Sequence, residues 1–325
     1  MEITENTLRV GIVGVDATPK HIVPLQSVTP SFFQSEPALQ DPASVWYRYL
    51  APILKSAYQR LIGFGAKERK AIVLFRGYDD KSLPRSIEDA ILAVLIAEVG
   101  VPAVNLQCSA LSMVPYSLPM LSHMLVVSVG IEEASCQVHA SGENLPFTYQ
   151  SVPLQSQTST KDDATTSFQS TYMDLNNPNS VLMAMVKTLE ACPRTVRKFV
   201  VSNIVFCGTG LCKQPHIPVA IVKQLKLALT AASSQSTSSS TRSETNPAMD
   251  LPQGDDDELV GNLQTLVPVS LKSLAGLESH VGLVKCNIRP DLLAWVGATQ
   301  WAAHWHGQDP SLQKWKWHTE WPSKS

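Results

Sequence analysis

The 325-residue chain lacks several features that would place it directly in a class of protein. It has no apolar run of the roughly 18 residues that a membrane-spanning helix requires. Its first residues are acidic, without the basic and then apolar segments of a secretion signal. Charged residues make up only 17% of the chain and the formal net charge is −2, so no global attraction to nucleic acid or to an anionic membrane is expected. These absences favour an intracellular protein without membrane insertion or nucleic-acid binding.

Paired metal-binding or catalytic motifs are also missing. The chain has no Cys-x-x-Cys spacing and no Gly-Lys-Ser/Thr phosphate loop, and no Ser/His/Asp constellation or carboxylate pair can be recognised. Cys207 and Cys212 flank a glycine turn, but two ligands without a second pair do not predict a metal site. We expect the cysteines to be mostly buried free thiols, which act as small hydrophobic side chains; they are Cys108, Cys136, Cys192, Cys207, Cys212 and Cys286.

What the chain does have is enough apolar sequence for two cores, with 44% hydrophobic residues. Short continuous apolar runs at 8–15 and 71–75 predict buried strands, and helical spacing at 45–62 and 86–99 predicts helices. Ser86 is placed to cap the second of these helices. This alternation of strands and helices predicts an α/β fold.

The composition divides the chain into three parts. Residues 1–150 are expected to form a first lobe, and 151–178, rich in Ser, Thr, Gln and Asp, a poorly ordered insert. Residues 179–325 are expected to form a second lobe. Within it, the serine tract and acidic run of 232–258 predict a disordered loop, and a tryptophan-rich tail follows.

Residues 124–138 predict a hairpin whose two strands meet at Gly130. Such hairpins can present backbone N–H groups to phosphate. A working phosphate hairpin also needs a carboxylate at the strand end, to hold a metal ion or to orient water. Ser128 and Val129 occupy that place here, so the hairpin has the shape of a nucleotide site but not its acid.

A second glycine turn, Gly208-Thr209-Gly210, lies between an expected strand and an expected helix. Backbone amides at the start of a helix can cradle phosphate. Glycine is equally common where a turn requires positive φ. The Gly-x-Gly-x-x-Gly pattern is not completed, so the conformational role is favoured over phosphate binding.

Six of the seven tryptophans follow residue 294. Interleaved Lys and His residues would suit stacking on single-stranded nucleic acid, but net basicity is absent. Tryptophan is enriched at protein interfaces, so the tail is expected to pack on the body or on a protein partner. The partner-binding candidates are Trp305, Trp315, Trp317 and Trp321.

Several segments, in one chain order, resemble actins and actin-related proteins. This resemblance implies a reduced two-lobed, actin-like (ribonuclease H-like) fold with two low-complexity inserts. In the last of these segments it implies a turn at Gly297 that leads into a helix. The matching segments are 8–24, 71–77, 86–109, 124–138, 203–210 and 289–303.

The departures from that family concern its nucleotide site. No strand or Asp-x-Gly loop is expected before Leu8, Ser128 replaces the second loop's aspartate, and Ser109 falls on the catalytic glutamine position. The resemblance therefore implies a protein that is not an enzyme, with no metal and no cofactor, in which ATP binding is not expected. The remnants of the site are Ser109, Ser128, Gly130, Gly208, Thr209 and Gly210.

Residues 180–211 are most similar to the branch of the family that caps the pointed end of the dynactin filament. This likeness implies a structural subunit of the cytoplasm and cytoskeleton that supports dynein-driven transport on microtubules. Its implied partners are the actin-related protein 1 filament and the other pointed-end subunits of dynactin. Two alternatives stay open: a divergent actin-fold ATPase, and an actin-related subunit of a nuclear chromatin-remodelling complex.

Overall fold

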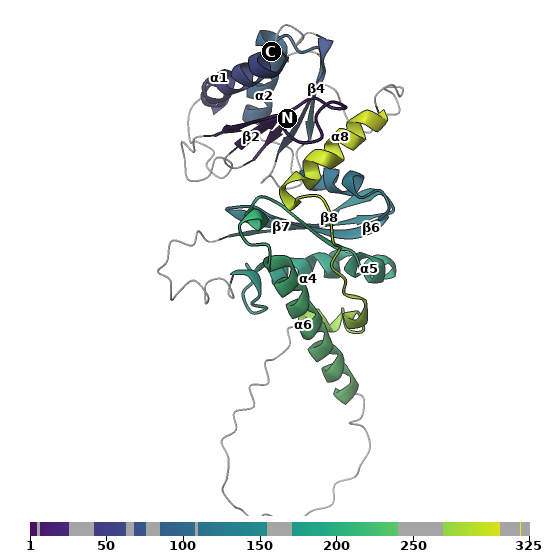
Figure 1. Ribbon diagram of the computed structural model, residues 1–325. Helices are drawn as coiled ribbons and strands as arrows, with labels where there is room; N and C mark the ends of the chain where they lie inside the picture. The colour runs from purple at the N-terminus through teal and green to yellow at the C-terminus, as the bar shows by residue number, and fades with distance from the viewer. Residues whose placement is uncertain are drawn as a thin grey trace, which may run out of the picture.

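The chain forms two mixed β-sheets, each covered by helices, as Figure 1 shows. The structure is a computed structural model. The α/β prediction is confirmed by this architecture. The structure describes residues 1–4, 7–25, 42–62, 68–75, 85–107, 110–154, 171–239, 269–305 and 319.

The first sheet has five strands in the order β3-β2-β1-β4-β5. Strand β2 runs antiparallel to both of its neighbours, whereas β1, β4 and β5 run parallel to one another. The strands are β1 (Glu2–Ile3), β2 (Thr7–Val10), β3 (His21–Pro24), β4 (Ala71–Phe75) and β5 (Val104–Gln107). The expectation that no strand precedes Leu8 was wrong, because β1 pairs with both β2 and β4.

Helices α1 (Pro42–Ile62) and α2 (Arg85–Leu92) cover this sheet, and α2 continues as a π-helical segment, η2 (Ala93–Glu98). Their buried side chains, among them Leu54 and Ile91, pack with those of β4 in one apolar core. The predicted helices at 45–62 and 86–99 are therefore confirmed. Ser86 is not the cap, because the helix begins one residue earlier.

The second sheet has four strands in the order β8-β7-β6-β9. Strands β6 and β7 form the predicted hairpin, with Ser128 opposite Ser135. Strand β8 extends the predicted first lobe beyond residue 150, and Val152 and Leu154 belong to the buried core. The prediction of a poorly ordered insert was therefore wrong at 151–154, and Tyr172, near the other end of the predicted insert, is buried in the same core. The strands are β6 (His123–Val129), β7 (Glu133–Ala140), β8 (Glu143–Pro153) and β9 (Ile204–Cys207).

The two sheets share one topology. In each, the first strand in the chain lies between an antiparallel second strand and a parallel fourth strand, and the third strand pairs with the second. The first sheet adds a parallel fifth strand, and in the second sheet Leu283 makes a single parallel bridge to Ile204 at the corresponding place. The predicted boundary at 150 does not coincide with the sheets, because β6–β8 share a sheet with β9.

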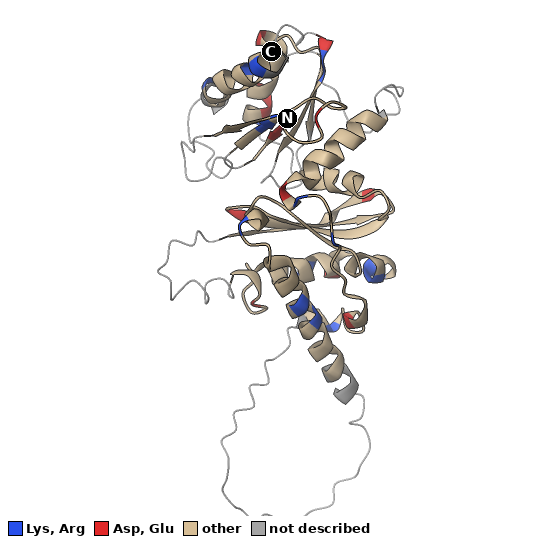
Figure 2. Cartoon of the chain, viewed as in Figure 1, with Lys and Arg blue, Asp and Glu red and all other residues tan. Residues whose placement is uncertain are grey.

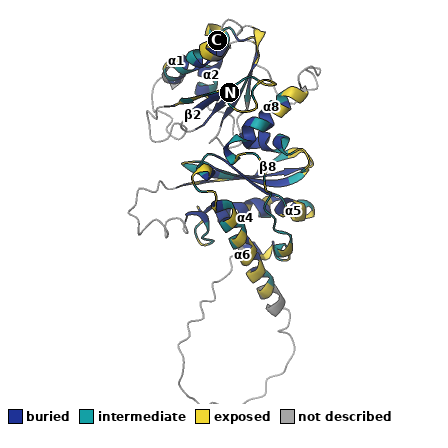
Figure 3. Cartoon of the chain, in the orientation of Figure 1, coloured by how far each residue is buried: buried dark blue, intermediate teal, exposed yellow. Residues whose placement is uncertain are grey.

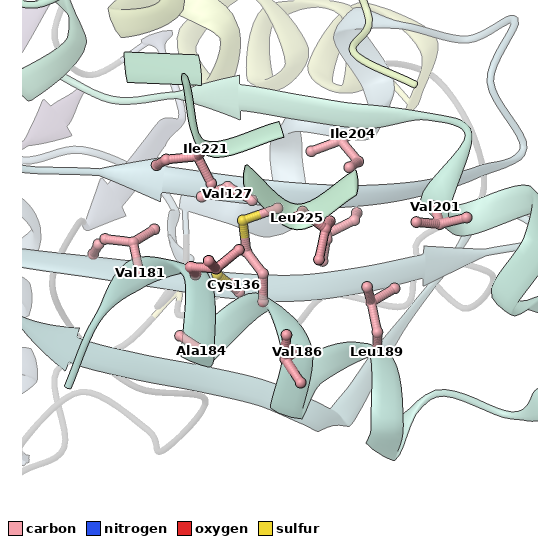
Figure 4. Close-up of a cluster of buried hydrophobic side chains, with 14 of the residues drawn as sticks. Val127, Cys136, Val181, Ala184, Val186, Leu189, Val201, Ile204, Ile221 and Leu225 are labelled. Carbon is pink, nitrogen blue, oxygen red and sulfur yellow. The ribbon is translucent and has the colours of Figure 1, made fainter. Parts of the chain in front are cut away.

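We call the first sheet with α1, α2 and η2 the first unit, and the second sheet with its helices the second unit. The helices of the second unit include α4 (Val181–Ala191), α5 (Arg194–Val201), α6 (Ile217–Ser239) and α7 (Val269–Lys272). Ser180 caps α4, since its hydroxyl accepts a hydrogen bond from the Met183 amide at 3.1 Å. Figure 4 shows side chains of α4 and α6 packed with β6, β7 and β9, including Leu189, Leu225 and Val127.

Helix α6 corrects the loop prediction at 232–258. The helix continues through the first part of the serine tract to Ser239, and Ala232 is fully buried in the second core. The Ser233 hydroxyl donates to the Leu229 carbonyl and contacts the Glu278 carboxylate at 2.9 Å. These contacts anchor the start of the serine tract in the helix. Residues 240–258 lie outside the described residues, as do 155–170 of the predicted insert.

The other face of the second sheet is covered by η3 (Ala110–Ser117) and α8 (Leu293–Trp305). The sequence predicts a turn at Gly297, but this residue lies inside α8. A Cβ atom on Gly297 would stand only 1.8 Å from the Met113 carbonyl oxygen. Glycine is needed here because α8 and η3 approach each other backbone to backbone. Figure 3 shows this region as largely buried.

Candidate functional site

The structure brings five of the six predicted nucleotide-site remnants together. Strands β6 and β9 are parallel neighbours, so the turn after β6 and the turn after β9 meet at one edge of the sheet. Ser128 and Gly130 come from the first turn, and Gly208, Thr209 and Gly210 from the second. Ser109 lies outside the described residues.

Gly208 and Gly210 are required by this close approach. Gly208 has φ of +114°, and a Cβ atom on it would lie 2.2 Å from the Val129 carbonyl oxygen. A Cβ atom on Gly210 would lie 2.3 Å from the Gly130 carbonyl oxygen. These distances support the conformational interpretation of the second glycine turn. Gly130 itself does not adopt positive φ.

Two amides of this junction are engaged within the protein. The Gly130 amide donates to the Glu133 carbonyl at 2.8 Å, which closes the β6–β7 turn. The Gly208 amide donates to the Pro290 carbonyl at 3.0 Å. Each N–H group has a single hydrogen to donate, so neither amide is available to a phosphate oxygen.

The Ser128 side chain at the junction does not supply the carboxylate that a metal-binding site needs. Ser128 is half-buried, lies beside Cys207 in the register of β9, and offers a neutral hydroxyl where a metal-binding site needs a carboxylate. Among the residues that the structure describes, no group of three or more His, Cys, Asp or Glu side chains could hold a metal ion. At this junction, the amides of Gly130 and Gly208 and the Ser128 side chain therefore offer neither a free N–H group nor a carboxylate to a magnesium nucleotide.

The turn between β1 and β2 is closed by two threonines. The Thr7 amide donates to the Thr4 hydroxyl at 3.1 Å, and the two hydroxyl oxygens lie 2.7 Å apart. Thr4 is buried, and its hydroxyl forms its hydrogen bonds with Thr7 within the turn. The Glu2 carboxylate, at the start of β1, lies 3.4 Å from the Arg9 guanidinium.

Arg9 joins the first sheet to the segment that precedes α8. Its guanidinium lies 2.9 Å from the Asp291 carboxylate and donates to the Asp291 carbonyl at 2.5 Å. Glu2, Arg9 and Asp291 are 0%, 6% and 3% exposed, so this ionic contact is almost entirely withdrawn from water. Arg289 covers the carboxylate from the outside with hydrogen bonds of 3.1 and 3.0 Å.

Sequence reasoning missed this ionic contact. The one available indication was a charged residue, Arg9, between Leu8 and Val10 in an otherwise apolar strand. A buried charge requires a partner, but the sequence does not show that the partner lies 282 residues away.

The charges in this contact set the ionisation of their neighbours. Burial alone would raise the pKa of Asp291, but the charge of Arg9, with the hydrogen bonds from Cys212 and Arg289, holds it below its ordinary value. Partial burial and then the Asp291 charge raise the pKa of the Cys212 thiol. Cys212 is therefore disfavoured as a thiolate nucleophile.

The expectation of buried free thiols is confirmed for three of the five described cysteines. Cys136, Cys192 and Cys207 are buried free thiols, whereas Cys212 is exposed and Cys286 is intermediate. Cys108 lies outside the described residues.

The described tryptophans of the C-terminal region pack on the body. Trp295 and Trp301 are buried, and a Cβ atom on Gly11 would lie 2.8 Å from the Trp295 ring. The backbone of Trp305 ends α8, while its side chain and all of Trp315, Trp317 and Trp321 lie outside the described residues. Their role in partner binding stays a prediction.

Two buried polar side chains on β7, Gln137 and His139, were not predicted. They are 1% and 3% exposed, and both Gln137 amide atoms and the His139 Nε2 atom lack a hydrogen-bond partner. Burial lowers the pKa of His139 to about 3. In the register they stand opposite Val126 and Met124, in the layer covered by η3. The period-two alternation of 135–139 could have indicated that they share one face.

Comparison of the sequence with protein-family models and with curated proteins finds no match to this chain. Within the described part of the chain, none of the helices combines the length and apolar character needed to cross a bilayer.

Proposed function

We propose that the chain is a non-catalytic, reduced actin-related protein that works by docking in a larger assembly. Its two sheets support an actin-like (ribonuclease H-like) fold, because that fold consists of two lobes built on one repeated strand order. Here both sheets have the order 3-2-1-4 with an antiparallel second strand. The segments that resemble actins also follow one another in the family's order.

The observation that carries the non-catalytic proposal is the closed junction between the two glycine turns. The amides of Gly130 and Gly208 donate to protein carbonyls, and Gly210 packs directly against Gly130. A phosphate bound between these turns would have to break two backbone hydrogen bonds and separate the two loops. The positions that would offer a metal-binding acid carry Ser128 instead.

Within the family we propose a role like that of actin-related protein 10, which caps the pointed end of the dynactin filament. The likeness rests on residues 180–211, which form α4, α5, β9 and the glycine turn. We propose that the link between β8 and α4 replaces the subdomain that covers the nucleotide in actins. Loss of one contact face leaves a head-to-tail interface that cannot propagate, which is what a cap requires.

The proposed partners are the actin-related protein 1 filament and the other pointed-end subunits, in the cytoplasm and cytoskeleton. Affinity purification of the tagged full-length chain from cell extract tests this, with tagged actin as the matched control. Dynactin and dynein subunits should be enriched over the control. Recovery of chromatin-remodelling subunits in their place would contradict the proposal and favour the nuclear alternative.

A further inference from the structure

Outside strands β6–β8, the second unit carries an unbalanced set of exposed cations, and Figure 2 shows Lys and Arg on its helices. Across residues 171–239 and 269–291, ten Lys and Arg face four Asp and Glu, whereas the whole chain has a net charge of −2. None of the four acids in these two ranges is exposed. Nine of the cations are exposed: Lys187, Arg194, Lys198, Lys213, Lys223, Lys226, Lys272, Lys285 and Arg289.

The acids of these ranges are held by local contacts. Glu190 accepts from the Ser273 hydroxyl at 3.3 Å, Glu278 contacts Ser233, and Asp291 binds Arg9 and Arg289. The Asp174 carboxylate accepts from the Asn176 amide. They leave the exposed cations of α5 and α6 without ion pairs in the described part of the chain. Among the described residues, no ion pair therefore cancels the positive charge of α5 and α6.

Helix α6 presents these cations together with exposed apolar side chains. Lys223 and Lys226 lie on its solvent side, with Val219 61% exposed and Leu227 55% exposed. The opposite side of α6, which includes Leu225, is buried in the core of the second unit. A helix fixed in this way offers a rigid surface of mixed basic and apolar character.

Helix α5 presents the same combination. Arg194 and Lys198 are exposed beside Phe199, which is 54% exposed. Its inner side is anchored by Arg197, whose guanidinium donates to the carbonyls of Cys192, Glu190 and Ser273. The charge on α5 is thus displayed on a helix that is fixed to α4 and to the segment after α7.

We propose that the outer face of α6, called here the basic face, docks an acidic, partly apolar segment of a protein partner. Carboxylates of the partner would pair with Lys223 and Lys226, and its apolar side chains would cover Val219 and Leu227, while α5 offers a second surface of the same character. Charge complementarity of this kind increases association rates and selects between partners. A docking face of this kind does not require the chain to be an actin-related protein.

The basic face suits an acidic protein better than the two other polyanions. Phe199 is the one large exposed aromatic residue on the described parts of α5 and α6, so these helices do not form a stacking platform for single-stranded nucleic acid. Insertion into a membrane needs a free apolar helix face, and the apolar face of α6 is occupied by the protein core.

Binding of a fluorescent peptide of about 12 residues that combines Glu with Leu and Phe tests this, measured by anisotropy on the full chain. The double variant Lys223→Glu/Lys226→Glu should bind about tenfold more weakly, because two favourable charge contacts become repulsive. Lys20→Glu/Arg60→Glu is the matched control. It makes the same charge change at exposed positions of the first unit and should bind like the wild type.

Affinity should also fall as salt is raised, and a peptide with Gln in place of Glu should not bind. Equal melting temperatures of the two double variants establish that both are folded. Equal peptide affinity of the two would overturn the proposal. Preference for single-stranded DNA or for phosphatidylserine vesicles over the peptide would overturn the choice of a protein partner. A separate partner would also be contradicted if neutralising Asp255–Glu258 strengthened peptide binding, since the chain's own acidic run would then occupy the face.

Discussion

Acidification should destabilise the second unit through His139. Because burial lowers its pKa to about 3, this side chain is neutral in the folded protein at every pH above that value. The unfolded chain takes up the proton as pH falls through about 6.5, the ordinary histidine value. The contribution of His139 to stability is therefore complete above about pH 6.5 and is lost progressively down to about pH 3.

The size of this effect follows from the difference in proton binding. Between about pH 7.5 and about pH 5, the free energy of unfolding should fall by about 2 kcal/mol from this residue alone. The variant His139→Leu should lose this part of the pH dependence, because it has no group to protonate. His21→Gln, which removes a half-exposed histidine on the edge strand β3, is the matched control.

Guanidinium-induced unfolding of the three proteins at the two pH values measures the difference. The smaller pH dependence of His139→Leu would support a closed layer between the second sheet, η3 and α8. If all three proteins lost the same stability between the two pH values, His139 would be protonated freely in the folded protein, and that layer would be open to water.

Three further predictions concern the junctions of the fold. Gly297→Ala should lower the melting temperature strongly, because the new Cβ would stand 1.8 Å from the Met113 carbonyl oxygen. The control Ala303→Ser, at an exposed position of α8, should leave the melting temperature unchanged, and equal melting temperatures of the two variants would contradict the close packing of α8 on η3. Asp291→Ala should cost about 3 kcal/mol in unfolding experiments, because it removes the carboxylate that lies 2.9 Å from the buried Arg9 and leaves Glu2, at 3.4 Å, as its acidic partner. A variant as stable as the wild type would refute the buried pairing. Millimolar Mg-ATP should leave the melting temperature unchanged. A bound ligand at 100 times its Kd would add about 2.7 kcal/mol of stability, so a clear rise in melting temperature would contradict the closed glycine junction.

The sequence predicted local structure where one segment determines it. The β6–β7 hairpin, the helix at 45–62 and the strand at 71–75 each follow from a periodic apolar pattern bounded by turn residues. It failed at Gly297, where a residue that usually marks a turn lies inside a helix. The reason is the backbone of Met113, which approaches from a segment far away in the sequence.

The sequence predicted which residues belong to the candidate site, but not how they are arranged. The pairing of the two glycine turns follows from the parallel register of β6 and β9, which no local pattern reveals. The engagement of the Gly130 and Gly208 amides depends on Glu133 and Pro290, one nearby and one distant. The serine tract after Ala232 was predicted as a loop because its composition is polar, yet tertiary packing extends α6 through its first part.

The proposed role as a cap is tested most directly on purified filaments of actin-related protein 1. The labelled full-length chain would be added to growing filaments and followed by fluorescence microscopy. We predict one label at one end of each filament, and no further growth at that end. Labels along the filament sides, incorporation into the filament, or no binding at concentrations that saturate the dynactin pointed end would contradict the proposed function.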